Sequence, residues 1–456
     1  MRRPNILLLY TDQQRWDALG ANGNGEIRTP HLDRLAADSV NFDHCFVQNP
    51  VCMPSRVSFL TGRYPSSLGI SHMGVPVPPD TVTLPRLLRG YGYTSGQIGK
   101  LHFLPHANRD HRKPHPDYGF DHLEISDEPG SYHAAYRAWV AAHAPDQLDH
   151  VSLGEAPSAI DWKRVMDVDD GIVHPEERFP KRPLGSRSRS DMTNAAFVAE
   201  QTMEFIGAHE DGPFLCVSGF YSPHSPWVAP QEFLDLYDPA ELTLPTFPAE
   251  LEARRGDGNF SDEELRGARQ GYYAMVSEVD HHVGRILDHL DERGVADNTI
   301  VVFASDHGAC LPDPGHSQKW PMYDQITRIP LIVSSPGRFD AGRAIDGLCQ
   351  QMDLGPAILE LAGAEVPEIL EAESLLPALE NKEWAGRDYV FAEQARDGIL
   401  TDTEFMTMVR SKGSIVASPT PVTPSFVSTS INTQFRLWAS TKYVLISVIF
   451  IYLSPN

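Results

Sequence analysis

The stretch Asn49-Pro50-Val51-Cys52-Met53-Pro54-Ser55-Arg56-Val57-Ser58-Phe59-Leu60-Thr61-Gly62-Arg63 carries the strongest structural signal in this chain. Pro54 suits the first turn of a helix. The backbone N–H groups of that turn have no partner within the helix, so the missing N–H of a proline costs nothing there. Residues 57–60 continue the helix toward Gly62. Cys52 is therefore predicted at or just before a helix N-terminus, where free N–H groups and the helix dipole favour a bound anion.

The segments on either side alternate between apolar, β-rich runs and helical patterns. This alternation is typical of an α/β fold with a mainly parallel central sheet that helices cover on both faces. The predicted strands are residues 5–11, 94–98, 214–220, 299–305 and 329–334. The predicted helices are residues 30–39, 191–208 and 261–293, the last of which opens with a Ser261/Glu264 capping box.

Polar side chains follow four of these predicted strands at their carboxyl ends. They are Asp12 and Gln13, Lys100 and His102, His224, and Asp306 and His307. In open α/β sheets, ligands bind outside the carboxyl ends of the strands. We therefore expect these residues, which are far apart in the sequence, to meet at one edge of the sheet and form one active site.

Composition and charge limit the function further. The chain has 456 residues, enough for one large α/β domain or two ordinary ones, and its formal net charge is −23. A chain this acidic is a poor binder of DNA, RNA or anionic membranes, so an anionic substrate must be captured by a local cluster of cations. The five cysteines (45, 52, 216, 310 and 349) are odd in number and form no C-x-x-C motif, which indicates reduced thiols.

Residues 1–10 have some features of a very short signal peptide, with two arginines before an apolar run. The apolar run is too brief for such a peptide, no small-residue cleavage site follows it, and Asp12 comes at once. We interpret the run as a buried first strand and expect a cytoplasmic protein.

We expect residues 1–380 to form the catalytic domain. Within it, residues 105–185 are rich in proline, histidine and charge and have weak periodicity, so we predict an insertion or long loops over one face. Residues 381–411 are predicted to begin a small C-terminal subdomain.

Residues 412–456 form an atypical tail. No Asp or Glu follows Glu404, and the apolar run at 443–453 is too short for a comfortable transmembrane helix. A frameshifted or otherwise aberrant tail is our first interpretation, a disordered tail the second and a membrane anchor the third. An aberrant tail would leave the small subdomain incomplete.

Cys52-Met53-Pro54-Ser55-Arg56 is similar to the C-x-P-S-R signature of the type I, formylglycine-dependent sulfatases, which belong to the alkaline phosphatase superfamily. At motif level the resemblance covers roughly residues 4–340. It implies an alkaline-phosphatase-like α/β/α sandwich and the hydrolysis of small-molecule sulfate esters. It also implies that a formylglycine-generating enzyme oxidises Cys52 to Cα-formylglycine (3-oxoalanine), and that Arg56 holds the hydrate of this aldehyde.

A hydrated aldehyde carries two hydroxyl groups on one carbon. By the resemblance, one hydroxyl attacks sulfur. The other can then lose its proton and expel sulfate by C–O cleavage, so that the aldehyde forms again and no water has to attack a sulfate diester.

The strand-end carboxylates of Asp12 and Asp306, with the amide oxygen of Gln13 and the imidazole of His307, form a ligand set for a divalent cation. Oxygen-rich ligation suits Ca²⁺ or Mg²⁺, and the imidazole also admits Mn²⁺ or Zn²⁺. By the resemblance, these positions hold one ion that also contacts the modified Cys52, and we expect Ca²⁺. Many family members have Asp-Asp and Asp-Asn where this chain has Asp-Gln and Asp-His, so the motifs indicate the presence of an ion more strongly than its identity.

Cations and histidines complete the predicted site. Gly99-Lys100-Leu101-His102 is similar to the G-K-x-H element of the family, in which the lysine contacts a sulfate oxygen and the histidine orients the nucleophile or assists its deprotonation. By the same resemblance, His224 binds the leaving-group side and Lys319 is a second sulfate-binding lysine. Either His224 or Lys319 is expected to be the general acid.

Three alternatives stay open. A phosphonate monoester or phosphodiester hydrolase on the same scaffold suits the Asp-Gln and Asp-His ligands, whereas Lys100 and His102 favour a sulfatase. A plain thiolate nucleophile at the helix N-terminus is a second alternative. An inactive binding protein is the third, if Cys52 is never modified. The sequence does not choose among aryl, sugar and choline sulfates. Four histidines of the 105–185 stretch have no ligand spacing and are expected at the surface: His106, His111, His115 and His122.

Overall fold

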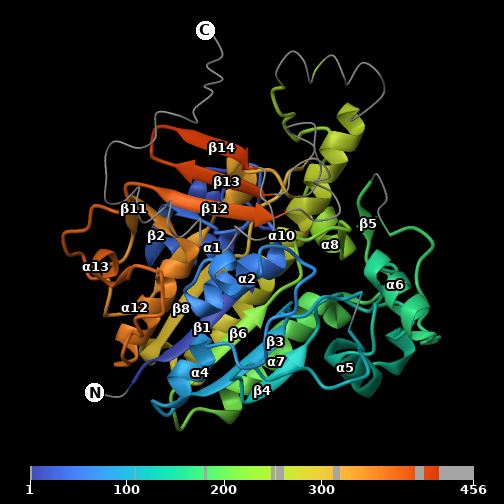
Figure 1. The fold of residues 1–456 in the computed structure, drawn as a ribbon. Coiled ribbons are helices and arrows are strands. Elements are labelled where there is room, and N and C mark those ends of the chain that lie inside the picture. Colours follow the sequence, from blue (N-terminus) through green and yellow to red (C-terminus); the bar gives the residue numbers. More distant parts are fainter. Residues whose placement is uncertain are drawn as a thin grey trace.

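The structure of this chain is a computed structural model, which describes residues 3–107, 109–178, 182–247, 252, 261–311, 319–395 and 405–420. Its centre is a nine-stranded sheet (Figure 1). Eight of the strands follow the order β11-β2-β10-β8-β1-β6-β3-β4, and the ninth, β9, pairs with β2. The strands are β1 (Asn5–Thr11), β2 (Val40–Phe46), β3 (Thr94–Gly99), β4 (His122–Ile125), β6 (Phe214–Gly219), β8 (Thr299–Ser305), β9 (Arg328–Ile329), β10 (Leu331–Ser334) and β11 (Arg343–Gln350).

Strand β1 lies in the middle of this sheet and all seven of its residues are buried. It pairs in parallel with β6 on one side and with β8 on the other. The register places Thr11 opposite Ser305 and Tyr10 opposite Gly219, so the three strands end at the same edge. A parallel strand buried on both faces reads as a continuous apolar run, which explains why β1 and β8 have the predicted bounds.

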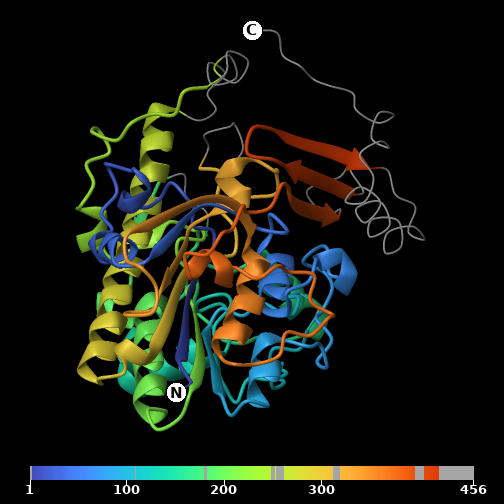
Figure 2. The same cartoon turned by 90° about the vertical axis from the view of Figure 1, so that its left-hand side faces the viewer.

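Helices cover both faces of the sheet, as Figure 2 shows with the sheet nearly edge-on. Leu7 and Leu9 of β1 pack with one helical layer, and Ile6 and Leu8 pack with the other. The first layer contains α1 (Pro30–Ala37), α5 (Ala135–His143), α7 (Asn194–Ala208) and α10 (Asp262–Glu292). The second contains α2 (Cys52–Thr61), α4 (Leu84–Arg89), α12 (Leu354–Leu361) and α13 (Leu376–Leu379). The predicted α/β/α sandwich with a mainly parallel sheet is confirmed.

The capping box predicted at the start of the 261–293 helix is confirmed. Ser261 accepts a hydrogen bond from the backbone N–H of Glu264, whose side chain accepts one from the backbone N–H of Ser261 in return. Helix α7 begins at Asn194 and not at the predicted residue 191, because the Thr193 side chain caps it by accepting the backbone N–H of Ala196. The predicted strand at 329–334 is interrupted, because β9 and β10 are separate strands that both run antiparallel to β2.

The 105–185 stretch contains more regular structure than the predicted loops. It supplies the edge strand β4, the helices α5 and α6 (Pro157–Met166) and the short strand β5 (Leu184–Gly185), which pairs with β7 (Val228–Ala229). None of the five cysteines, all of which are buried, is in a disulfide. No helix in the described ranges has both the length and the apolar character needed to cross a membrane.

A second, antiparallel sheet lies near the C-terminus. Its order is β12 (Val390–Ala395), β13 (Phe405–Arg410) and β14 (Ile415–Thr420). Strand β14 begins within the atypical 412–456 tail, so the first residues of that tail complete a sheet. The predictions for residues 421–456 lie outside the described residues.

Candidate active site

Helix α2 places the predicted nucleophile. The helix begins at Cys52, after Val51 in an extended conformation, and ends before Gly62, whose φ of 65° suits a glycine. Every residue of α2 is buried, and the side chain of Val51 gives the helix no cap. Cys52 therefore lies in the first turn at a helix N-terminus, as the sequence predicted.

The thiol of Cys52 lies among cations. The Nζ atom of Lys319 is 3.3 Å from its Sγ atom. Burial alone would raise the pKa of the Cys52 thiol, but the positive charges of Lys319 and Lys100 outweigh burial and lower it. The carboxylate of Asp12 acts in the opposite direction and raises the pKa of the thiol.

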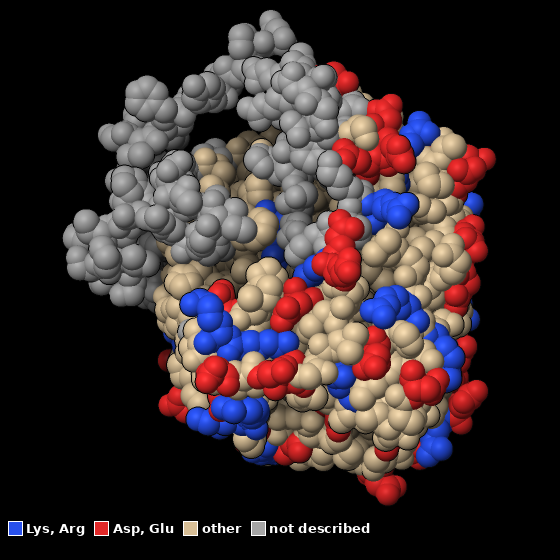
Figure 3. Space-filling model, turned by 90° about the vertical axis from the view of Figure 1, so that its right-hand side faces the viewer, with Lys and Arg blue, Asp and Glu red and all other residues tan. Residues whose placement is uncertain are grey.

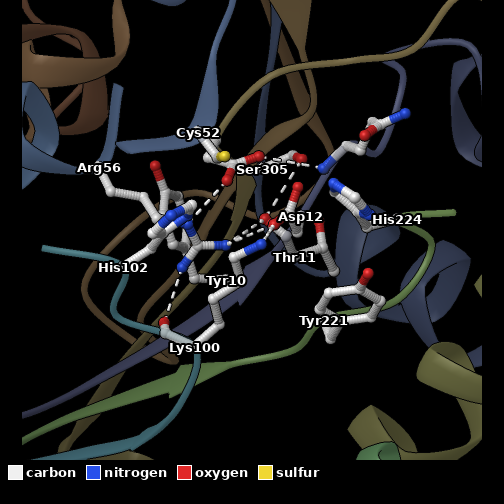
Figure 4. A network of polar contacts seen from close by, with 12 residues as sticks. Tyr10, Thr11, Asp12, Cys52, Arg56, Lys100, His102, Tyr221, His224 and Ser305 are labelled. Atoms are coloured by element: carbon white, nitrogen blue, oxygen red, sulfur yellow. Dashed lines mark hydrogen bonds and ion pairs between the residues drawn. The ribbon is translucent and has the colours of Figure 1, made fainter. Parts of the chain in front are cut away.

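Two buried carboxylates follow the central strands β1 and β8, and each uses one oxygen to bind a cation. The Oδ2 atom of Asp306 accepts from Nε of Arg56 at 2.7 Å. The Oδ2 atom of Asp12 forms an ion pair with Lys100. Burial would raise the pKa of Asp12, but Lys100 and the neighbouring positive groups hold it well below its usual value. Figure 4 shows Asp12, Lys100 and the α2 residues Cys52 and Arg56 converging from three segments of the chain.

The remaining carboxylate oxygens face His307. Its Nδ1 atom lies 2.7 Å from the carbonyl oxygen of Gly308, and because a carbonyl only accepts, Nδ1 carries the proton. The lone pair on Nε2 then faces Oδ1 of Asp12 at 3.8 Å and Oδ1 of Asp306 at 3.7 Å. These distances are too long for hydrogen bonds, and they suit three ligands around one ion.

The donor set fits a divalent cation. Ligand atoms of Asp12, Asp306 and His307 all lie within 4.8 Å of one another, and all three residues are buried. Oδ1 of Asp12, Nε2 of His307 and Oε1 of Gln13 are buried and have no hydrogen-bond partner among the described residues. Buried polar atoms are normally paired, so their unpaired state is itself evidence for a ligand.

Gln13 is held in an unusual backbone conformation. Its φ is 72°, in the left-handed region that a glutamine rarely adopts. Two contacts hold it there: its N–H donates to Oδ1 of Asp306 at 3.0 Å, and its carbonyl accepts from the hydroxyl of Tyr272 at 2.8 Å. Such strain is typical of functional sites, where the surroundings hold a residue in place.

His224 and Lys319 form a second pair beside Cys52. Nδ1 of His224 donates to the carbonyl of Ser225 at 2.6 Å, so its Nε2 accepts from Nζ of Lys319 at 3.2 Å. Burial and then the charge of Lys319 lower the pKa of His224 well below its usual value. His224 is therefore neutral, and the proton between the two residues belongs to Lys319.

A model of the sulfatase family matches residues 4–364. The chain belongs to the sulfatase family. The predicted family and the predicted enzyme class, sulfuric ester hydrolases, are thereby confirmed.

Named relatives agree with this membership. The chain is 29% identical to an arylsulfatase of Clostridium perfringens over 415 residues, which cover 86% of this chain and 82% of the relative. It is 29% identical to an ulvan-active sulfatase of Formosa agariphila over 387 residues, which cover 83% of this chain and 65% of the relative. The fold is also similar to the crystal structure of a phosphonate monoester hydrolase of Agrobacterium radiobacter, with a TM-score of 0.74, 22% identity and coverage of 96% and 95%.

The G-K-x-H element of this sulfatase-family chain forms a tight loop after β3. Gly99 has a φ of 78°, and a Cβ atom there would lie 2.1 Å from the carbonyl oxygen of Gly219. His102 is also left-handed, with a φ of 55°. Burial and then the charge of Lys100 lower the pKa of His102 to about 3, so its imidazole is neutral.

Asp127 holds this loop, and sequence reasoning missed it. A single carboxylate oxygen of Asp127 accepts the backbone N–H of Leu101 at 2.9 Å and that of His102 at 2.8 Å. The residue is buried and comes two positions after β4, in the stretch predicted as loops. Its only signal in the sequence is that it follows a short strand, which was itself missed.

The expectation that four further histidines lie at the surface was wrong for His106. That residue is 6% exposed, packs edge-on against His102 with ring centroids 4.6 Å apart, and lies 3.7 Å from Oδ2 of Asp127. Its burial was missed because Asp127, the carboxylate beside it, comes from a separate segment of the chain. The other three are half-buried: His111, His115 and His122.

Proposed function

We propose that this protein is a formylglycine-dependent hydrolase of sulfate esters, in which Cys52 is the precursor of the nucleophile. The observation that carries the proposal is the contact between the Cys52 thiol and Lys319, beside the buried ligand set of Asp12, Asp306 and His307. A formylglycine-generating enzyme is then a required partner. Its product supplies a hydrated aldehyde as the nucleophile.

The local charge suits an anionic ester. Arg56, Lys100 and Lys319 supply three positive charges, whereas Asp12 and Asp306 supply two negative ones, in a chain whose net charge is −23. Outside the site, the face in Figure 3 shows basic and acidic side chains interspersed, which supports the proposal that nucleic acid is not a partner.

Asp12, Gln13, Asp306 and His307 would hold one divalent cation, for which Ca²⁺ is our first choice and Mg²⁺ or Mn²⁺ the alternatives. When bound, such an ion lowers the pKa of a coordinated hydroxyl and polarises a sulfate oxygen. Lys100, whose ammonium group pairs with Asp12 in this structure, would bind a sulfate oxygen of the substrate.

Lys319 and His224 act on the leaving-group side. Because Nε2 of His224 accepts from Lys319, the ammonium of Lys319 carries the proton that the leaving oxygen needs. We therefore assign Lys319 as the general acid and His224 as the residue that orients it. Arg56 stays fully charged next to Asp306 and Asp12 and binds the nucleophile as a permanent cation.

A phosphonate monoester or phosphodiester hydrolase is the second candidate. The Asp-Gln and Asp-His ligand pairs support it. The likeness to the phosphonate monoester hydrolase of Agrobacterium radiobacter concerns the fold alone, which both candidates share. Against the second candidate, Lys100 and His102 lie at the site, and their G-K-x-H element is similar to that of the sulfatases.

The experiment is a comparison of kcat/KM for an aryl sulfate and an aryl phosphonate monoester, with Cys52→Ala as the inactive control. We expect the sulfate to be the better substrate. Faster cleavage of the phosphonate would replace the first candidate by the second. Unmodified Cys52 with no turnover of either would favour a binding protein. The choice among aryl, sugar and choline sulfates needs a substrate panel, and the cytoplasmic location stays a prediction.

A further inference from the structure

Strand β12 of the C-terminal sheet lies against the segment that leads into Cys52. One edge of β12 pairs with β13. On the other edge, the N–H of Phe391 donates to the side-chain oxygen of Gln350 at 2.8 Å, and the N–H of Glu393 donates to the carbonyl of Gln48 at 2.9 Å. The N–H of Ala395 donates to the carbonyl of Ser71 at 3.1 Å. Alternate residues of β12 therefore bind the catalytic domain, as the period of a strand requires.

Asn49 joins this strand to the start of α2. It is completely buried, and both halves of its amide are used. Its oxygen accepts the N–H of Val51 at 2.9 Å, and its nitrogen donates to the carbonyl of Glu393 at 2.5 Å and to that of Ser71 at 3.2 Å. One side chain thus connects β12 to the residue that immediately precedes Cys52.

The start of α2 depends on this connection. Val51 occupies the cap position and has no side-chain oxygen with which to accept an N–H of the first turn. Asn49 instead fixes Val51 in its extended conformation, and the carbonyl of Val51 then accepts the first helical hydrogen bond from Ser55 at 3.1 Å. The direction in which Cys52 enters the helix follows from these contacts.

We propose that Asn49 is a positioning residue for the nucleophile, and that strand β12 holds Asn49 in place. The inference rests on the proposed function, because it takes residue 52 as the nucleophile. The hydrogen bonds of the Asn49 side chain go to Val51, Glu393 and Ser71, so it acts on the nucleophile through the backbone of residues 51–52. The C-terminal sheet then has a catalytic purpose, although its described strands contribute no residue to the predicted site.

The test uses three variants of the full chain, produced with a formylglycine-generating enzyme. Asn49→Asp keeps an oxygen for Val51 but places a second carboxylate oxygen against the carbonyls of Glu393 and Ser71. Asn49→Ala removes both halves of the contact. Glu393→Gln is the matched control, because it changes the same junction but keeps an oxygen for the N–H of Ser66, which the side chain of Glu393 now accepts.

We expect kcat for an aryl sulfate to fall about 10- to 100-fold in Asn49→Asp and at least as far in Asn49→Ala, with KM within about threefold of wild type, because small displacements of a nucleophile are costly. Glu393→Gln is expected to stay within about twofold of wild type. The formylglycine content of residue 52 and the folded fraction are measured in every sample. Wild-type kcat in folded, modified Asn49→Asp overturns the proposal, and so does a loss that the folded fraction alone explains.

Hydrogen–deuterium exchange of the peptide spanning residues 49–60 separates this proposal from the proposed function. We expect faster exchange in both Asn49 variants and unchanged exchange in Glu393→Gln. If modified wild-type protein does not hydrolyse the sulfate, the proposed function fails and the exchange rates decide: the expected pattern supports positioning by Asn49, whereas equal exchange in all variants overturns it.

Discussion

The carboxylates at the centre of the site and the carboxylate at its rim come from different kinds of strand. Asp12 and Asp306 follow β1 and β8, which are adjacent, parallel and fully buried. Asp127 follows β4, an edge strand whose four residues are only half-buried. Both carboxylates of the central pair bind cations, and Asp306 also accepts the N–H of Gln13, whereas the hydrogen bonds of Asp127 come from backbone N–H groups. The residues after the core strands thus supply the chemistry, because they bind the charged groups of the site. The residue after the edge strand supplies the geometry, because it holds a loop of the site in position.

Replacing a central carboxylate is expected to have the largest effect. Asp306→Asn removes a ligand charge and leaves Arg56, buried beside it, without its closest carboxylate. We expect kcat/KM to fall by roughly 10²- to 10³-fold or more, because preorganised charges contribute that much to catalysis. Metal content, measured on the purified protein, should fall as well.

The matched control for this prediction is Asp346→Asn. Asp346 is exposed and pairs with His44 and Lys412 at the surface. Since surface ion pairs contribute little to stability, we expect activity and metal content close to those of wild type. Equal losses in the two variants would show that Asp306 has no special place in the site.

Replacing the rim carboxylate is expected to have a smaller and different effect. Asp127→Ala frees the N–H groups of Leu101 and His102 and lets the left-handed loop relax. We expect kcat to fall about 10- to 100-fold, while the metal content stays unchanged.

Asp127→Asn sharpens this comparison, because the amide oxygen still accepts both N–H groups. It should recover most of the activity that Asp127→Ala loses. If Asp127→Asn is as inactive as Asp127→Ala, the charge of Asp127 is what matters, and the division between chemistry at the core and geometry at the edge is wrong.

Glu278 is a buried carboxyl outside the site and has neither role. Replacing it is expected to change the stability of the protein, and this is the smallest of the predicted effects. Glu278 in α10 is 3% exposed, and burial raises its pKa to about 7. The folded state therefore binds this proton more tightly than the unfolded chain does. The stability that Glu278 contributes is fully present below about pH 4.5 and is lost as the pH rises through about 7.

The contribution of Asp12 to stability has the opposite pH dependence. Its lowered pKa makes this contribution present at neutral pH and lost in acid.

Glu278→Gln should raise the free energy of unfolding by about 1–3 kcal/mol at pH 8 and change it little at pH 4.5, because it removes a buried charge. Denaturant unfolding at both pH values checks this. A stabilisation that does not depend on pH would contradict it.

The same contrast explains what the sequence could predict. β1 and β8 have continuous apolar runs, so their ends, and with them Asp12 and Asp306, were visible. β2 contains Asp43 and His44 among its apolar residues, and β4 and β11 lie at the edges with half-exposed residues, so these three strands had no clear pattern.

The site followed the same rule. Residues in short motifs after the central strands lie together. Lys319, which the resemblance alone assigned to the site, contacts His224, 95 positions away in the chain. Asp127 and Asn49 act by accepting or donating to backbone groups, and this role depends on a register that only the folded chain defines. No residue type or spacing in the sequence predicts this role.

The chemical state of residue 52 in active protein is the central question that the proposed mechanism raises. Peptide mass spectrometry of metal-loaded enzyme that hydrolyses an aryl sulfate measures it directly. We predict a peptide lighter than the encoded one by the difference between a thiol and an aldehyde, in proportion to activity across preparations. Full activity with an unmodified Cys52 thiol would contradict the formylglycine mechanism.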